Sequence, residues 1–292
     1  MTDILDKLRV SAEEIEEKLD ALLPTEREGR IGENRLSRAM RYSVMSPGKR
    51  LRPFLVMASS SLFGVGKDSA LQVAASIEFI HAYSLIHDDL PALDDDDLRR
   101  GRPSCHKEFD EATAILAGDA LLTFAFEVLS HPSTHSDGGV RAELVQCVAK
   151  ACGASGMVGG QMIDLLSGER ELNIEQITRL QRLKTGALFA ISCEAGAILG
   201  KAAIQPRNAL RGYANDMGLA YQITDDLLDA EAREGRQNKS EEKGTYVSIM
   251  GVEKARMQAE LLTTQAIAHL HVFDKKADPL RDLARHMFER KN

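Results

Sequence analysis

Apolar residues recur at helical spacing along almost the whole chain. The pattern places them three and four residues apart, as one apolar face of an α-helix requires, in the segments 68–89, 111–130, 139–168 and 175–203. Spaced runs of alternating β-branched residues, which predict strands, do not occur. The pattern therefore predicts an all-α protein, a single large helical bundle that spans 1–292 as one domain.

Two polar segments interrupt this pattern. The first, 130–139, is predicted to connect two helices. The second, 231–246, is highly charged and has almost no apolar anchor. It is either a solvated linker or a lid that orders over a charged ligand, and we take 231–244 as a mobile, charged lid loop.

Composition narrows the class of protein. With 292 residues and 43% apolar side chains the chain can bury a full core, and a net charge of −7, 5% aromatics and no Trp argue against nucleic-acid binding. A signal peptide has a basic segment followed by an apolar one, whereas this chain starts with an acidic, amphipathic segment, so no signal peptide is expected. No membrane span is expected either. The four cysteines form no CxxC pair, which favours a reduced, cytoplasmic setting.

Two sets of aspartates stand on apolar helices. Asp88 and Asp89 end one helix, since Pro91 stops it, and a helix C-terminus already carries partial negative charge. Asp225 and Asp229 are four apart and share a helix face with Asp226 beside them, where like charges repel. Both arrangements are unfavourable unless they hold a cation.

The residue types indicate which cation. Carboxylates without Cys or His favour Mg²⁺ or Ca²⁺ over Zn²⁺, and neither set has the Gly and Glu of an EF-hand loop. Mg²⁺ keeps several waters and shares substrate phosphates, so the two sets predict an Mg-bound diphosphate. For Asp95 to Asp97 alone, a solvated surface turn is the better interpretation.

Basic residues accompany the acidic ones. Lys49, Arg50 and Arg52 stand at the start of an apolar helix, which is electrostatically unfavourable unless an anion lies between them. Arg99 and Arg100 follow the first aspartates. Each of these cations could alternatively extend from a helix surface into water.

Together the motifs resemble those of the bacterial short-chain trans-prenyl diphosphate synthases, and most of all the farnesyl diphosphate synthases (geranyltranstransferases). They run in the family's order from about residue 45 to 246: GKRLRP, EFIHAYSLIHDDLPALDDDDLRRGRPSCHK, AGDALL, GGQMIDL, LKTGALF, YQITDDLLD and KGTY. The resemblance implies an all-α isoprenoid synthase fold with a deep central cavity, usually in a homodimer. It also implies the condensation of isopentenyl diphosphate with dimethylallyl or geranyl diphosphate to farnesyl diphosphate (C15). The cofactor would be Mg²⁺, three ions per site, with Mn²⁺ as a substitute.

The resemblance also implies roles for individual residues. The metal ligands would be Asp88, Asp89, Asp94, Asp225, Asp226 and Asp229. The diphosphate of isopentenyl diphosphate would be held by Lys49, Arg52, His81 and Arg100. The allylic diphosphate would be held by Arg99, Lys184, Thr185, Gln222 and Lys243. The cavity wall would include Gln161 and Asp164.

The chain departs from the family between the second aspartate set and Lys243. Family members carry a Gly-Lys pair there, and this segment lacks it. Lys239 and Arg236 are the candidates to replace the missing lysine. A weaker closure over the allylic diphosphate is the expected consequence.

Product length is predicted from the helix that ends at Asp88. Tyr83 lies five residues earlier, about 7.5 Å along the axis, and Ser84 lies one turn from Asp88. In the family a bulky residue here closes the cavity at fifteen carbons, so we take Tyr83 and Ser84 as the chain-length floor. The alternative is that Tyr83 is an ordinary core aromatic.

Other functions fit less well. A class I terpene cyclase would share the first aspartate set but needs an Asn/Ser/Glu metal set later, where this chain has TDDLLD. A geranyl or geranylgeranyl diphosphate synthase of the same family would differ only in product length. A catalytically weak, diphosphate-binding partner subunit would explain the shortened lid.

Overall fold

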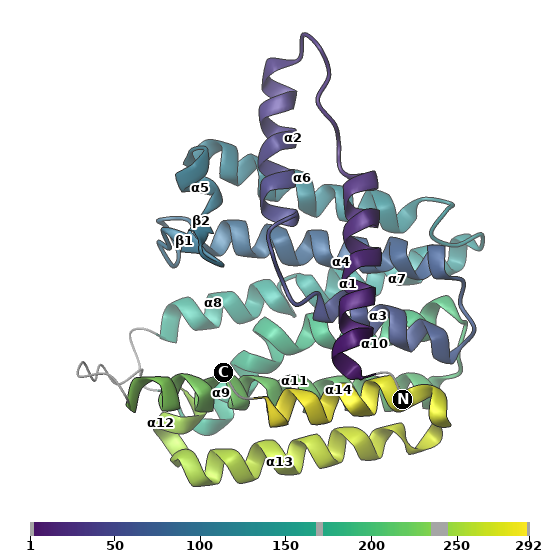
Figure 1. Ribbon diagram of the computed structural model, residues 1–292, viewed down its shortest axis with the longest axis vertical. Helices are drawn as coiled ribbons and strands as arrows, with labels where there is room; N and C mark the ends of the chain where they lie inside the picture. Colours follow the sequence, from purple (N-terminus) through teal and green to yellow (C-terminus); the bar gives the residue numbers. More distant parts are fainter. Residues whose placement is uncertain (1–2, 168–171, 235–244, 291–292) are drawn as a thin grey trace. The chain divides into compact units, whose positions relative to one another are not determined.

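The computed structural model describes residues 3–167, 172–234 and 245–290. This part of the chain is almost entirely helical (Figure 1). It divides into two compact units. The first unit contains 1–57 and 65–145, and the second contains 58–64 and 146–292. The prediction of an all-α fold is confirmed. The predictions of one domain over 1–292 and of a deep central cavity stay predictions.

The first unit is built around helix α4. Its elements are α1 (Ile4–Leu22), α2 (Ile31–Val44), α3 (Leu51–Leu62), α4 (Lys67–Asp88), β1 (Leu98–Arg99), β2 (Arg102–Pro103), α5 (Cys105–Glu108), α6 (Glu111–Ser130) and α7 (Gly138–Cys152). Helices α3 and α7 continue past the boundary into the second unit. As expected, a connector separates α6 from α7.

Helix α4 is buried because it is apolar on all its faces. Val73, Ile77 and Ile80 are fully buried, and the ring of Phe79 packs against the ring of Phe124 on α6, with 5.2 Å between centroids. The helix ends at Asp88, as the following Pro91 predicts. This packing fixes the position of the first aspartates within the unit.

A short hairpin follows that the sequence pattern did not predict. Strands β1 and β2 pair antiparallel, with Leu98 opposite Pro103. The two turn residues, Arg100 and Gly101, both have positive φ, 53° and 76°, as a type I′ hairpin turn requires. Two residues per strand are too few to show alternation in a sequence, so the expectation of no sheet missed it.

Helix α6 is apolar along most of its length. Among the described helices it is the one long and apolar enough to cross a membrane by length and composition alone. Its Ala114, Ala117, Leu121 and Ala125 are fully buried, and it packs against α4 (Figure 1). The core helix of a folded unit meets the same criterion, so this is weak evidence for a membrane span.

The second unit contains the end of α3, the end of α7 and all the elements that follow α7. Its elements are α8 (Met157–Ser167), α9 (Ile174–Gln181), a π-helical turn η1 (Arg182–Gly186), α10 (Ala187–Leu199), α11 (Ile204–Glu234), α12 (Tyr246–Met250), α13 (Val252–His269), the 3₁₀ turns η2 (Leu270–Val272) and η3 (Lys275–Ala277), and α14 (Asp278–Glu289). Helices α11, α13 and α14 run side by side (Figure 1). The fully buried Tyr213 joins α11 to α14 by donating from its hydroxyl to the carbonyl of Leu280 at 2.7 Å.

The charged segment 231–244 begins within a helix. Helix α11 extends to Glu234, so residues 231–234 are helical rather than part of a loop. Glu231 forms an ion pair there with Arg256 of α13, 2.6 Å between Oε1 and Nη2. Residues 235–244 lie outside the described residues.

Candidate active site

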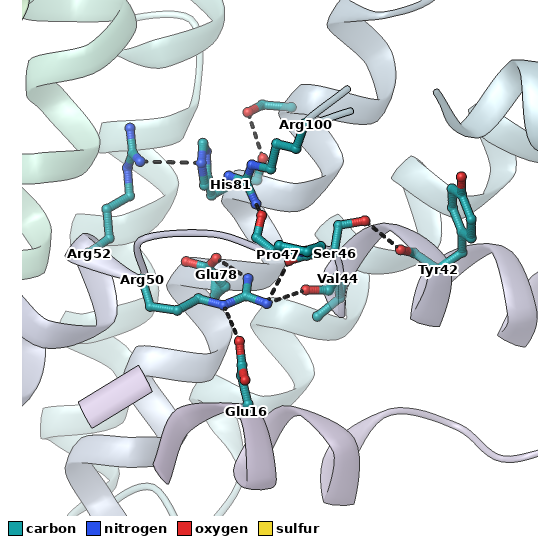
Figure 2. Close-up of polar contacts among 11 residues, drawn as sticks. Glu16, Tyr42, Val44, Ser46, Pro47, Arg50, Arg52, Glu78, His81 and Arg100 are labelled. Atoms are coloured by element: carbon teal, nitrogen blue, oxygen red, sulfur yellow. Dashed lines mark hydrogen bonds and ion pairs between the residues drawn. The ribbon is translucent and has the colours of Figure 1, made fainter. Parts of the chain in front are cut away.

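Three segments of the first unit bring basic residues together: the turn before α3, helix α4 and the hairpin. Figure 2 shows Arg52 directed at His81, with Nη1 3.3 Å from Nε2. Arg100 reaches the same turn and donates from Nη1 to the carbonyl of Pro47 at 2.9 Å. Lys49 lies in the turn and is exposed. The four residues expected to hold isopentenyl diphosphate thus come from one local arrangement.

Gly48 makes room for this arrangement. A Cβ at position 48 would lie 2.5 Å from Nη1 of Arg100. Any other residue would therefore displace the end of the Arg100 side chain from the turn. The glycine of GKRLRP allows this close approach.

His81 is neutral in this surrounding. Its pKa lies well below its ordinary value because burial disfavours the charged ring, and Arg52, Arg100, Arg50 and Arg99 repel a proton on it. A neutral imidazole has one acceptor nitrogen, so Nε2 can accept from Arg52. The neutral ring then orients the cationic Arg52 and adds no positive charge of its own.

Arg50 does not join the exposed cations. Its side chain is 2% exposed, and its Nη1 lies 2.7 Å from Oε1 of Glu78. The sequence led us to expect a bound anion among the three cations of the turn. For Arg50 this expectation is wrong, because its counter-ion is Glu78 of the same chain.

Two aspartates of the first set, Asp88 and Asp94, lie in one turn. Asp94 donates from its backbone N–H to the carbonyl of Asp88 at 2.9 Å, so the chain folds back and the two residues share one turn. Asp94 is exposed and Asp88 partly so. These two carboxylates are placed where they could share an ion.

Asp89 has a partner inside the chain. Its side chain is 3% exposed, and Arg99 of β1 donates from Nε to Oδ1 at 2.8 Å. Burial raises the pKa of the Asp89 carboxyl, and the hydrogen bonds from Arg99 act in the opposite direction. Arg99, expected at the allylic diphosphate, also contacts Asp96 at 2.9 Å. Asp97 is 74% exposed and pairs with Lys107, which agrees with a solvated surface turn.

In the second unit, η1 carries Lys184 and Thr185. Short π-helical turns are frequent at functional sites. The ammonium of Lys184 lies 2.5 Å from Oδ2 of Asp164 on α8. The hydroxyl of Thr185 donates to Oε1 of Gln222 on α11 at 3.4 Å. Four residues expected at the allylic diphosphate or the cavity wall therefore meet within this unit.

Gly160 allows α8 to approach η1. A Cβ there would lie well under 3 Å from backbone atoms of Lys184, which explains the second glycine of GGQMIDL. The next residue, Gln161, has a buried Oε1 that accepts no hydrogen bond from the described residues. Gln161 directly follows the glycine that contacts the turn carrying Lys184.

The second aspartates also have partners. Asp225 forms an ion pair with Arg290, whose guanidinium stacks over the ring of Tyr221 at 4.4 Å. Asp226 accepts from the backbone N–H of Tyr246 at 2.8 Å, at the start of α12. Asp229 is exposed. Sequence reasoning missed Arg290, because the basic C-terminus gives no sign of a partner 65 residues earlier.

A cavity of about 720 Å³ opens within the second unit beside these aspartates. Arg290 lines it and also bonds Asp225. The rest of the lining comes from Thr224, Leu227, Leu228, Glu231, Ala232, Arg256, Phe288 and Glu289.

Some expected residues cannot be placed. Lys243, Lys239 and Arg236 lie outside the described residues. Within the described ranges, no three Asp, Glu, His or Cys side chains form a group that could hold a metal ion. The two aspartate sets belong to different units, and their convergence stays a prediction.

Tyr83 lies in the first unit on the side of α4 that carries His87. It is 6% exposed, and its ring meets the imidazole of His87 edge to face at 5.8 Å. Nε2 of His87 is 3.1 Å from the carbonyl of Ile115 on α6. Ser84 donates to the carbonyl of His81 at 2.9 Å. The role of Tyr83 and Ser84 as a chain-length floor stays a prediction.

Comparison with known proteins agrees with this architecture. The chain matches the polyprenyl synthetase family over residues 33–277. It is 41% identical over 267 residues to a farnesyl diphosphate synthase of Haemophilus influenzae, covering 88% of this chain and 90% of that protein. It is 41% identical over 261 residues to a geranylgeranyl diphosphate synthase of Cyanophora paradoxa, covering 87% of each. The apo structure of an FPP/GFPP synthase from Zymomonas mobilis matches with a TM-score of 0.90 and 48% identity over 98% of each chain.

The chain therefore belongs to the polyprenyl synthetase family, and the resemblance of its motifs is confirmed. It is a short-chain prenyltransferase, an all-α transferase of isoprene biosynthesis. Members of this family generally depend on a divalent metal.

Proposed function

We propose that the enzyme joins isopentenyl diphosphate to dimethylallyl or geranyl diphosphate and releases farnesyl diphosphate. The observation that carries this proposal is the convergence of Arg52, His81 and Arg100 on the turn that holds Lys49. A site for a second diphosphate is what a prenyltransferase needs and a cyclase lacks. The names of the relatives support both C15 and C20 products, and Tyr83 favours the shorter one.

The donor chemistry of the aspartates fits Mg²⁺, because their oxygens are hard ligands and exposed carboxylates leave room for retained waters. We propose Asp88, Asp94, Asp225 and Asp229 as ligands. Asp89 and Asp226, which are bound to Arg99 and to the backbone of Tyr246, would hold neighbouring elements in place. Three ions per site and the use of Mn²⁺ belong to the proposal. When bound, the metal would neutralise the charge of the leaving diphosphate.

The protein's own residues would carry the rest of the reaction. Lys184, Thr185 and Gln222, with Arg99 and Lys243, would hold the allylic diphosphate while its C–O bond breaks. Lys49, Arg52, His81 and Arg100 would orient isopentenyl diphosphate so that its double bond attacks the allylic cation. The proton then leaves to the released diphosphate. Cations fixed before the reaction stabilise the leaving group without reorganisation.

The test is an assay of the purified chain with Mg²⁺, geranyl diphosphate and isopentenyl diphosphate. A C15 diphosphate as the main product is expected. A C20 product would assign a geranylgeranyl diphosphate synthase, and a cyclised hydrocarbon would assign a cyclase. Absence of any product would favour the weak partner subunit.

The homodimer and the cytoplasmic setting are part of the same proposal. Ile115 and Leu116 of α6 are 45% and 57% exposed in the first unit, which suits apolar contact with a second copy. Light scattering of the purified protein is expected to give twice the mass of the 32.1 kDa chain. A monomer mass would contradict the dimer and leave the activity untouched.

A further inference from the structure

Arg50 occupies the centre of a buried polar network in the first unit (Figure 2). Its φ is +45°, a left-handed conformation that residues other than glycine adopt rarely. It persists only where the surroundings impose it. Arg50 lies between Lys49, which is exposed, and Arg52, which meets His81. Its backbone therefore decides how these two neighbours point.

The guanidinium of Arg50 bonds in several directions at once. Nη1 donates to Glu78 at 2.7 Å and Nε donates to Glu16 at 3.3 Å. Nη2 donates to the carbonyls of Val44 and Ser46, both at 2.9 Å. These carbonyls lie at the C-terminus of α2, where a helix carries partial negative charge. The side chain thus joins the end of α2 to α1 and α4.

Glu78 is the buried partner on α4, with a side chain 5% exposed. It precedes His81 by three residues, about 4.5 Å along the helix axis. Helix α4 therefore offers Glu78 to Arg50 and His81 to Arg52. The two contacts together fix the register of the turn against α4. His81 and Asp88 are seven residues apart and lie within about 20° of the same helix face, so the same register relates the turn to the first aspartates.

We propose that Arg50 and Glu78 are positioning residues for isopentenyl diphosphate: they hold Lys49 and Arg52 in their binding geometry and do not touch the substrate. The inference rests on the proposed isopentenyl diphosphate site. Glu78 and Glu16 neutralise Arg50. Of the three cations of the turn, two therefore remain for the diphosphate, Lys49 and Arg52. Arginine is needed here because its planar fork reaches separated acceptors, whereas a lysine ammonium is a single point.

The test compares Arg50→Lys and Glu78→Gln with the unchanged enzyme. We expect KM for isopentenyl diphosphate to rise at least about tenfold, while kcat and KM for geranyl diphosphate stay within about threefold. Because Arg50→Lys keeps the positive charge, a rise of KM for isopentenyl diphosphate in this variant would be caused by the loss of the planar guanidinium fork. An unchanged KM for isopentenyl diphosphate in both variants would overturn the proposal.

Arg281 provides a matched control for lost stability. It bonds Asp278 at 2.7 Å and the carbonyls of Leu270, Phe273 and Asp274, and its side chain is 16% exposed. Arg281→Lys should lower the melting temperature in the same way as Arg50→Lys and leave KM for isopentenyl diphosphate unchanged. An equal rise of that KM in Arg281→Lys would show a general loss of structure and overturn the proposal.

Two further variants complete the design. Arg52→Ala tests the underlying site: if its KM for isopentenyl diphosphate rises and that of Arg50→Lys does not, the site is right and the positioning role is wrong. If Arg52→Ala changes nothing, the proposed site itself fails.

Glu16→Gln removes the partner of Arg50 that is 43% exposed, so this variant should fold even if the buried variants do not. It should raise the same KM about twofold to threefold, and no change would count against the network.

Discussion

Arg99 of β1 donates from Nε to Oδ1 of Asp89 at 2.8 Å and so ties the hairpin to the C-terminus of α4. Asp88, one residue earlier, is the last residue of that helix and is partly exposed. Adjacent aspartates of one motif therefore serve different ends. Asp89 holds the protein's own arginine, and Asp88 is the residue that we propose as a metal ligand.

Asp88→Ala and Asp225→Ala should each lower turnover by at least about 100-fold, a loss of roughly 2.7 kcal/mol in the barrier. Each removes a proposed ligand of the ions that stabilise the leaving diphosphate. Steady-state kinetics at saturating Mg²⁺ measures the effect. Asp97→Ala is the control from the same run of aspartates, because its side chain is 74% exposed, and it should stay within about twofold. Near-normal rates in both ligand variants would refute the metal site.

Asp89→Asn should act on stability more than on metal use. The variant leaves the half-buried Arg99 with Asp96 as its one remaining anionic partner among the contacts described above, and the lost hydrogen bond to a charged group costs about 1.5–3 kcal/mol. Urea unfolding measures this loss, and Mg²⁺ titration of the activity measures metal use. A larger shift of the Mg²⁺ midpoint than in Asp88→Ala would instead make Asp89 a direct ligand.

The neutral His81 predicts a pH dependence of stability. Because its folded pKa lies well below its ordinary value, the unfolded chain binds a proton below about pH 6.5 that the folded chain does not bind. The free energy of unfolding should therefore fall as the pH drops below about 6.5, by up to about 1.4 kcal/mol per pH unit. Urea unfolding at pH 7.5, 6.5 and 5.5, without metal or substrate, measures it.

His81→Gln should flatten this dependence, because glutamine does not titrate. His271→Gln changes an exposed histidine and should leave the slope as it is. Equal slopes for the unchanged protein and His81→Gln would show that other groups cause the pH effect.

Arg290→Ala should strengthen metal binding at the second aspartate set. The arginine occupies Asp225, whose side chain is 38% exposed, and an ion pair of that exposure is worth at most about 1 kcal/mol. The affinity for Mn²⁺ should rise by up to about fivefold, measured by electron paramagnetic resonance of free Mn²⁺ without substrate. Arg285→Ala removes an exposed arginine that pairs with Asp282 and serves as the control. Weaker Mn²⁺ binding in Arg290→Ala would reverse the assignment and make Arg290 a support of the site.

Tyr83→Ala should release products longer than C15, because the ring is expected to close the cavity one and a half turns before Asp88. Chromatography of the dephosphorylated products gives their length. Ser84→Ala, which loses only a hydroxyl bonded to the carbonyl of His81, should give mostly C15. An unchanged product from Tyr83→Ala would make Tyr83 an ordinary core residue that packs on His87.

The sequence was informative where local rules decide the structure. The end of α4 at Asp88 follows from Pro91, and α3 begins at Leu51, within the GKRLRP motif. The clustering of Lys49, Arg52, His81 and Arg100 came from the family resemblance, and the structure places these residues around one turn.

Other features depend on distant partners. Arg50 resembled its neighbours Lys49 and Arg52 in the sequence, and only its contact with Glu78, 28 residues away, distinguishes it. The pair of Arg290 and Asp225 spans 65 residues. The π-helical turn at Lys184 and the β1–β2 hairpin are too short for a periodicity to reveal them.

The hairpin has a consequence for insertions and deletions. Arg99 and Arg100 are adjacent, yet one serves Asp89 and the other the carbonyl of Pro47. Removing or adding one residue between Leu98 and Pro103 would shift the register and move both arginines off their partners together. Natural variants of this enzyme should therefore accept side-chain changes in this stretch far more readily than a change in its length.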